Sequence, residues 1–335
     1  MRKSALLLLA LIVLAGIVIL YPHILASASR VAHALQQQVH QNTEHAFFQD
    51  GFHTNTAKHS IPLDQILDGG PGKDGIPALL HPAFVSVSDA GQFLSDNSAG
   101  LVVTVGTTTR FYPFAILNWH EVVDDTIAGR PLLITFCPLC GSSIVYDRRV
   151  DGKERIFGVS GKLYESNLLM YDYETESLWS QVQGEAVVGD EIGKKLEIYP
   201  ADVLKFSAAR KLYPRLEVLS RATGYARAYR LDPYGDYAST SDLIFPVSVQ
   251  DHRLPAKELM YIVYVDGASV ALRLKDLRAA RHAEVTVHQK KIVADITEKG
   301  LSVHELGQSN IIPGYYAMWF SWAAFHNKDG ILWQK

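Results

Sequence analysis

Both cysteines of this 335-residue chain lie in the stretch FCPLCGSS (136–143), separated only by Pro and Leu. Because the chain has no other cysteine, Cys137 and Cys140 can pair only with each other. Thiolates bind soft or borderline metals such as copper and zinc, and two neighbouring thiols can also cycle between dithiol and disulfide. The pair is therefore a candidate metal site, a candidate redox couple or a local structural bridge.

The residues around the pair favour one of the two usual C-x-x-C geometries. In thioredoxin-like proteins the motif begins a helix, whose dipole stabilises a thiolate. Here GSSIVYDRRV follows Cys140, and its β-branched and aromatic residues predict a strand. The stretch PLLITF before the pair predicts another strand. We therefore expect a knuckle, a tight turn between two strands with both sulfurs on one side.

A zinc ion at such a knuckle needs further ligands, whereas a two-coordinate cuprous ion needs none. His120, in the upstream stretch NWHEVVDD, is the nearest candidate ligand. If this stretch is helical, His120 and Asp124 share one face. The stretch differs from the H-E-x-x-H zinc motif because Asp124 replaces the second histidine. A hydrogen-bonded structural histidine is the alternative interpretation of His120.

Three other side chains are candidates for a pocket near the pair. Trp179 and Gln181 lie in YDYETESLWSQVQGE, which a solvated hairpin packed on Trp179 would also explain. His326 follows YAMWFSWAAF and reaches the pair only through the fold. GVSGKL (158–163) is neither a nucleophile elbow nor a P-loop, because Lys162 stands where the elbow requires glycine. The sequence thus assigns no catalytic residue and leaves open whether the chain is an enzyme.

The elements that position these residues are mostly strands. LVVTVGTTTRFYPFAIL predicts a hairpin, and ERIFGVS, LLMYDYE, SLWSQVQG and EAVVGD predict further strands. Helical spacing is confined to DVLKFSAARKLY and YAMWFSWAAFH. We expect a β-rich α+β fold over residues 61–335, a single antiparallel-sheet domain with a few packing helices.

One pattern occurs twice within this body. GLVVTVGTTTRFYPFAILNWHEV (100–122) resembles ELMYIVYVDGASVALRLKDLRAA (258–280). Each has a strand, a glycine turn, a second strand and a short apolar segment. The pattern indicates either a duplicated β-hairpin unit or the general likeness of hairpins.

The composition of residues 1–29 predicts a transmembrane anchor or signal segment. Arg2 and Lys3 precede an apolar run over residues 5–21, which as a helix spans roughly 25 Å. This predicts a transmembrane anchor with the N-terminus inside and an extracytoplasmic body, periplasmic or extracellular. Ala26-Ser27-Ala28 leaves a cleaved signal as the alternative. An oxidising compartment would permit a disulfide.

Residues 30–60 are rich in His, Gln, Asn and Thr and predict a polar stalk. The net charge of −3 and the lack of basic runs argue against nucleic acid as a partner. The membrane, through residues 5–21, is the one partner that the sequence predicts, and no protein partner is identified.

Several motifs together carry a family resemblance: KDGIPAL, WHEVVDDTIAGRPLLITFCPLCGSSIVYDR, GVSGKLYESNLLMYD, SLWSQ and WFSWAAFH. They resemble DUF3179, a prokaryotic domain family of unknown function, from about Ile61 to the end of the chain. The resemblance implies that the family signature includes Cys137, Cys140, His120, Trp179 and Gln181. Where such proteins usually have His-Pro, this chain has His326-Asn327. The resemblance does not point to any particular activity.

We therefore expect a membrane-anchored extracytoplasmic protein that binds copper or zinc through Cys137 and Cys140, with His120 as a helper. One alternative is a thiol–disulfide redox protein that uses the same pair. The other is a ligand-binding or assembly module in which the cysteines are structural.

Overall fold

The computed structural model describes residues 51–335, which belong to one compact unit, Asp50–Lys335. The predicted membrane or signal segment, residues 1–29, and residues 30–50 of the predicted stalk lie outside the described residues. No helix within the described part of the chain has the length and apolar composition needed to cross a bilayer.

The described end of the predicted stalk contacts the body. Phe52 is buried and meets Tyr171 edge-on, with 5.4 Å between the ring centroids. His59 forms an isolated β-bridge with Val188. Residues 51–60 are thus packed against the strands that follow them in the chain.

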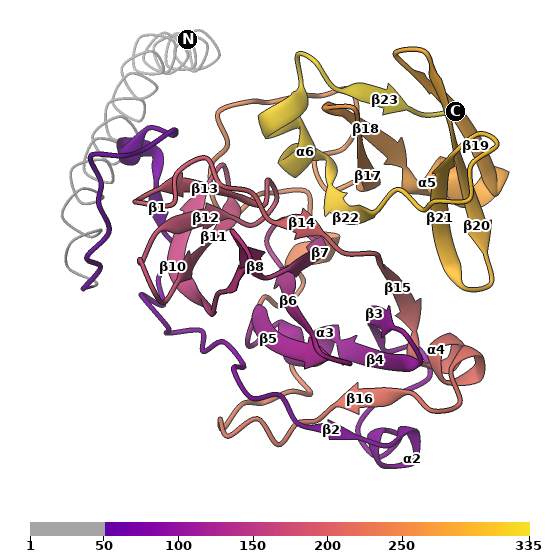
Figure 1. Cartoon of the computed structure of the whole chain (residues 1–335), viewed down its shortest axis with the longest axis horizontal. Coiled ribbons are helices and arrows are strands. Elements are labelled where there is room, and N and C mark those ends of the chain that lie inside the picture. Colours follow the sequence, from indigo (N-terminus) through magenta and orange to yellow (C-terminus); the bar gives the residue numbers. More distant parts are fainter. Residues whose placement is uncertain (1–50) are drawn as a thin grey trace, which may run out of the picture. The chain divides into compact units, whose positions relative to one another are not determined.

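Strands dominate the described residues, which confirms the prediction of a β-rich body with few helices (Figure 1). They form several sheets rather than one. The largest has eight strands and runs in the order β23 (Ile331–Trp333), β18 (Ala268–Arg273), β17 (Leu259–Val265), β22 (Gly314–Met318), β7 (Ser142–Asp147), β6 (Arg130–Cys137) and β5 (Val122–Ile127), with β14 (Glu197–Ile198) beside β7.

Four smaller sheets complete the described strands. One runs β1 (Leu67–Asp68), β10 (Phe157–Tyr164), β11 (Asn167–Asp172), β12 (Leu178–Ser180) and β13 (Glu185–Val188). Another runs β15 (Ala201–Lys205), β3 (Ala99–Val105), β4 (Thr108–Pro113), β16 (Glu217–Leu219) and β2 (Phe84–Val85). The last two are β19 (His282–Val287), β20 (Lys290–Thr297) and β21 (Gly300–Glu305), and the pair β8 (Arg149–Val150) and β9 (Lys153–Glu154). Most pairings are antiparallel, but β16 with β4 and β18 with β23 are parallel.

The helices are short. They are α2 (Val87–Ala90), α3 (Phe114–Leu117), α4 (Phe206–Leu212), α5 (Leu274–Ala280) and α6 (Trp319–His326), with 3-10 turns η1 (Leu63–Gln65) and η2 (Tyr237–Ser239). Most of each predicted helix is helical, but the first residues of the two stretches pair as strands β15 and β22. Tertiary pairing has therefore overridden the local helical spacing.

A further correction concerns NWHEVVDD. Helix α3 ends at Leu117 and strand β5 begins at Val122, so His120 lies in the turn between them and Asp124 lies in the strand. The expectation that His120 and Asp124 share a helical face is wrong. The apolar residues of β5 pair with β6, and this pairing fixes the extended conformation.

The repeated sequence pattern continues over a longer stretch in the structure. The order strand, strand, helix and three antiparallel strands occurs as β3-β4-α3-β5-β6-β7 and again as β17-β18-α5-β19-β20-β21. In both copies the residue directly before the strand that follows the helix, Glu121 or Arg281, is left-handed, with φ of 57° and 60°. Its carbonyl accepts a hydrogen bond from Phe136 in the first copy and from Ile296 in the second. The two halves thus share element order and local hydrogen bonding.

A long irregular connection joins β16 to β17, from residue 220 to residue 258, with η2 as its only described helical turn. Loops of this length without regular structure are uncommon in compact domains and are often functional. This connection bonds to two other turns. The indole of Trp119, between α3 and β5, donates to the carbonyl of Leu231, and the hydroxyl of Tyr237 donates to the carbonyl of Leu139 in the β6–β7 turn.

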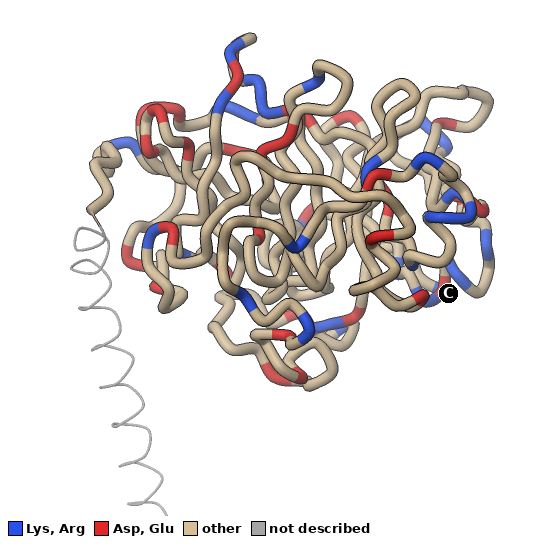
Figure 2. The backbone as a smooth tube through the Cα atoms, turned by 90° about the horizontal axis from the view of Figure 1, so that it is seen from below, with Lys and Arg blue, Asp and Glu red and all other residues tan. Residues whose placement is uncertain are grey.

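Acidic and basic residues are interspersed along the described backbone, as Figure 2 shows. Several form exposed ion pairs, such as Lys58 with Asp190 and Lys290 with Asp266. Such pairs contribute little to stability because water screens them. The stability of the fold therefore depends mainly on its buried apolar clusters.

Candidate functional site

The cysteine pair closes the β6–β7 hairpin, which confirms the predicted strand–turn–strand geometry. Cys137 pairs with Ser142 at the last register position of the two strands. Gly141 has a left-handed φ of 59°, and a Cβ at this position would come within 3.1 Å of the Met318 side chain. Glycine is therefore required here both for the backbone conformation and for the close approach of β22.

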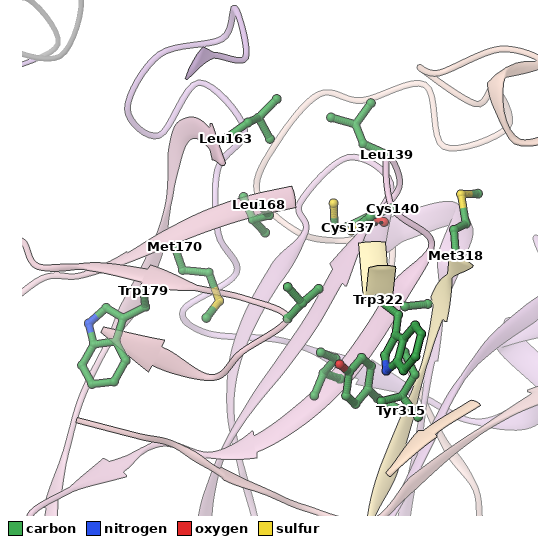
Figure 3. Packing of buried hydrophobic residues seen from close by; sticks show 14 of the residues in the cluster. Cys137, Leu139, Cys140, Leu163, Leu168, Met170, Trp179, Tyr315, Met318 and Trp322 are labelled. Atoms are coloured by element: carbon green, nitrogen blue, oxygen red, sulfur yellow. Dashed lines mark hydrogen bonds between the residues drawn. The ribbon is translucent and has the colours of Figure 1, made fainter. Parts of the chain in front are cut away.

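The turn lies inside the protein rather than on its surface. Its backbone carbonyls are satisfied by distant segments: Met318 N donates to Cys140 O, and the Tyr237 hydroxyl donates to Leu139 O, both at 2.8 Å. Figure 3 shows the two cysteines in one apolar cluster with Leu139, Leu163, Leu168, Met318 and Trp322. Because an unpaired carbonyl is costly in such a setting, these contacts fix the position of the turn.

Both cysteines are free thiols and are almost completely shielded from water, with exposures of 1% for Cys137 and 0% for Cys140. The Cys140 thiol donates to the backbone carbonyl of Cys137 at 3.9 Å, and its sulfur lies 3.1 Å from the Ser142 hydroxyl oxygen. The two cysteines lie close together, and each changes the pKa of the other.

A buried chain of hydrogen bonds extends from Cys140. Thr135 donates to the carbonyl of Ile144, so its oxygen accepts from the Gln181 amide nitrogen at 2.8 Å. This orients the Gln181 carbonyl oxygen toward Ser142, whose hydroxyl donates to it at 2.6 Å. Because the Ser142 hydroxyl proton is used in the bond to Gln181, the Ser142 oxygen accepts a hydrogen bond from the neutral Cys140 thiol. When Cys140 ionises, the hydroxyl can rotate and donate to the sulfur.

The two thiols differ in acidity. Burial opposes charge on either sulfur, and with the neighbouring Cys140 it raises the pKa of Cys137 well above the ordinary value. For Cys140, interactions with the side chains of Cys137 and Ser142 outweigh the effect of burial and lower its pKa. Cys140 is therefore the sulfur that ionises first.

Glu121 faces the same region. Its carboxyl group is buried, and the Tyr234 hydroxyl donates to its Oε1 at 2.7 Å. Burial raises the pKa of Glu121 to about 7, although the hydrogen bond from Tyr234 lowers it. Its charge opposes ionisation of both cysteines, which shows that the three groups interact electrostatically. A carboxyl group that titrates near neutrality beside a thiol pair can exchange protons with it.

A cavity of about 220 Å³ adjoins the cysteine turn. Leu139, the residue between the two cysteines on the Cys140 side, forms part of its wall, and Glu121 and Tyr234 bring polar groups to it. Lys162 also lines it and is ion-paired with Asp68 at 3.4 Å. Its remaining walls are mainly apolar and include Pro71, Ile76, Val159, Leu163, Leu168, Ile244 and Phe245.

The imidazole of His120 is hydrogen-bonded to residues other than the two cysteines. Its Nδ1 donates to the carbonyl of Pro77, and its Nε2 accepts from the Tyr229 hydroxyl, both at 2.7 Å. Burial lowers the pKa of this imidazole, which keeps it neutral. Both ring nitrogens therefore have protein partners, as expected for a structural histidine.

The other three predicted site residues lie in different surroundings. Gln181 joins the pair through Ser142, as described above. Trp179 is fully buried, and its indole donates to Asp172 at 2.9 Å. His326 contacts the Tyr264 hydroxyl at 3.1 Å. Of these three predicted residues, only Gln181 is linked by hydrogen bonds to the thiols.

No group of three or more His, Cys, Asp or Glu side chains is arranged to hold a metal among residues 51–335. The described residues thus offer Cys137 and Cys140 alone, without the further ligands that a tetrahedral zinc site needs. A cuprous ion held by two thiolates does not need such ligands.

The second copy of the repeated unit provides an internal control for the cysteine turn. Its equivalent hairpin, β20–β21, closes between Thr297 and Gly300 without any cysteine. The position of Glu121 is taken by Arg281 in that copy. The same hairpin can therefore form without the thiols and without the acid, which argues that these residues serve more than the turn.

Sequence reasoning missed Glu121, Ser142, Thr135 and Tyr234. Glu121 lies beside His120, and Ser142 lies within the FCPLCGSS stretch, so attention to polar neighbours of the motifs would have found both. Tyr234 lies in an irregular segment without periodicity, and only the fold brings it to Glu121.

Comparison with known proteins gives one match. The model of a family described as "Protein of unknown function (DUF3179)" matches residues 73–329. No curated protein and no solved structure matches the chain.

The acidity of Glu121 predicts a pH-dependent stability. Its pKa of about 7 in the folded protein exceeds the ordinary 4.5, so the native state holds a proton that the unfolded chain releases. Stability from this group is therefore greatest at low pH and falls as the pH rises through 7, by about 3 kcal/mol. In Glu121→Gln this loss should be absent, as measured by urea unfolding followed by circular dichroism between pH 5 and 8.

The exposed Glu197→Gln serves as the matched control, and its stability should follow the wild-type profile. Parallel pH profiles for the wild type and Glu121→Gln would show that Glu121 is not a neutral acid in the folded protein.

Proposed function

The chain belongs to the DUF3179 family, and we propose that Cys137 and Cys140 form a reversible dithiol–disulfide couple. The observation that carries this proposal is the closeness of two free, buried thiols whose pKa values shift in opposite directions. Disulfide formation requires two sulfurs in contact, one of which is readily ionised. The cysteine-free hairpin of the second copy supports a role beyond structure.

The reaction follows from the different acidity of the two sulfurs. The Cys140 thiolate attacks one sulfur of an external disulfide, forms a mixed disulfide and releases the first thiolate of that molecule. Cys137 then loses its proton and attacks the Cys140 sulfur, which releases the second thiolate. The two protons from the protein thiols pass to the two released thiolates. The dithiol is oxidised by two electrons, and the external disulfide is reduced by two.

Side chains around the pair support each step. Ser142 can turn its hydroxyl from Gln181 to the Cys140 sulfur and stabilise the thiolate. Glu121 titrates near neutrality and is placed to accept the proton that Cys137 releases. The apolar cluster around the sulfurs limits access of water and of large partners, so opening of the covering residues 220–258 would be needed for a protein substrate.

The proposed setting is the outer side of a membrane. The apolar run over residues 5–21 supports a tethered body that faces an oxidising compartment. In such a compartment a dithiol couple can be oxidised and can then pass its disulfide to other thiols.

A cuprous ion is the second candidate, and the shared environment of the two sulfurs favours it. Both thiols are buried in one apolar cluster, which suits a soft, two-coordinate ion. Binding would require loss of both thiol protons, which burial of Cys137 opposes. This cost places the copper hypothesis behind the redox hypothesis.

The two single variants should separate the roles of the sulfurs. With a small disulfide such as 2-hydroxyethyl disulfide, Cys137→Ser should accumulate one equivalent of mixed disulfide on Cys140. Cys140→Ser should react at least about tenfold more slowly, because burial disfavours the Cys137 thiolate. Mass spectrometry of quenched samples measures both products. Equal rates for the two variants would contradict the assignment of Cys140 as the attacking sulfur.

The copper hypothesis predicts stoichiometric binding by the reduced chain. Titration with a cuprous salt against a coloured chelator should give one ion per chain, lost in Cys137→Ser and in Cys140→Ser. His120→Ala should bind like the wild type, because both ring nitrogens already have other partners. Copper that remains bound in the double Cys→Ser variant would rule out the pair as its site.

A further inference from the structure

Four separate sequence motifs meet at the cavity beside the cysteine turn. KDGIPAL contributes Ile76, the stretch NWHEVVDD contributes Glu121, and the C-P-L-C turn contributes Leu139. GVSGKL contributes Val159 and Gly161 to Leu163, where β10 departs from regular pairing with β11 in a bulge between Val159 and Lys162. Such bulges are frequent beside functional sites because they redirect side chains. The fold thus gathers distant motifs around one small space.

The carboxyl group of Glu121 supplies a hydrogen-bond acceptor to the cavity. Glu121 is 5% exposed, and the Tyr234 hydroxyl donates to its Oε1. Its Oε2 is not among the fully buried unpaired atoms of the described residues, so this oxygen is accessible from the cavity that the side chain lines. A bound molecule that donates to Oε2 would gain a hydrogen bond in a largely apolar space.

We propose that this cavity binds a compact, uncharged molecule with an apolar ring or short apolar body and one hydroxyl group. The hydroxyl contacts Oε2 of Glu121, and the apolar part packs against the side chains of Ile76, Leu139 and Phe245. A hydroxyl both donates and accepts hydrogen bonds, so it suits either protonation state of the carboxyl group.

The volume limits the size of this ligand. An apolar cavity of about 150 Å³ accommodates a benzene ring, so about 220 Å³ suits one ring with a small substituent. Peptides and nucleotides are too large for this space. Phenol is therefore a suitable probe, and toluene, of similar shape but without the hydroxyl, is its matched control.

The ligand site is distinct from the thiol chemistry. Leu139 lines the cavity, whereas neither cysteine does. Binding should therefore persist, within about twofold, in the full chain that carries both Cys137→Ser and Cys140→Ser. This variant separates a failure of the ligand proposal from a failure of the redox proposal.

Calorimetric titration of the full chain with phenol and with toluene tests the proposal. Phenol should bind at one site per chain and about tenfold more tightly than toluene, because the hydroxyl gains the contact to Glu121. In Glu121→Leu the preference for phenol should disappear. Ile76→Trp should fill the cavity and abolish binding of both probes, and the exposed Glu197→Gln should bind like the wild type.

Near-ultraviolet circular dichroism checks that each variant is folded, and Ile76→Trp provides a second test from another wall if Glu121→Leu does not fold. Three results would overturn the proposal: no binding of phenol by the wild type, equal affinity for phenol and toluene, or phenol affinity that is unchanged in a folded Ile76→Trp or Glu121→Leu variant.

Discussion

The β6–β7 hairpin ends inside the apolar core, and this constraint organises its surroundings. A turn at such a position has carbonyls and hydroxyls that water cannot reach, so other parts of the chain must bond to them. Met318 at the end of β22 and Tyr237 in the long connection supply donors to the backbone of the turn. Gln181, beyond β12, pairs with Ser142. Three segments distant in sequence are thus held together by one buried turn.

The same constraint gives the thiols their chemistry. Burial makes charge costly, so the few hydrogen bonds that reach a sulfur decide which thiol ionises. The Cys140 sulfur contacts the Ser142 hydroxyl and its pKa is lowered, whereas the pKa of Cys137 is raised. The same shielding raises the pKa of Glu121 to about 7, and this residue links the thiol pair to the cavity. Proton transfer, sulfur chemistry and ligand binding are therefore all proposed around the turn of residues 137–140.

The sequence predicted the local features of this site well. The strands on either side of the cysteines follow from β-branched residues in PLLITF and SSIVYD, and the turn follows from its proline and glycine. Long-range features were not accessible. His120 and the cysteines share a sequence block, yet the imidazole bonds to Pro77 and Tyr229 instead. The helix expected at DVLKFSAARKLY is present, but it begins only at Phe206, because pairing with β3, remote in sequence, extends the first residues of the stretch.

An equilibrium redox titration tests the central claim most directly. The full chain is incubated in thiol–disulfide buffers of graded potential, acid-quenched and analysed by mass spectrometry for the Cys137–Cys140 disulfide. The account predicts one two-electron transition, with a tenfold change in the ratio of dithiol to disulfide for about every 30 mV. It also predicts that the protein stays folded on both sides of this transition. A folded protein whose two thiols remain reduced under strongly oxidising buffers would contradict the account.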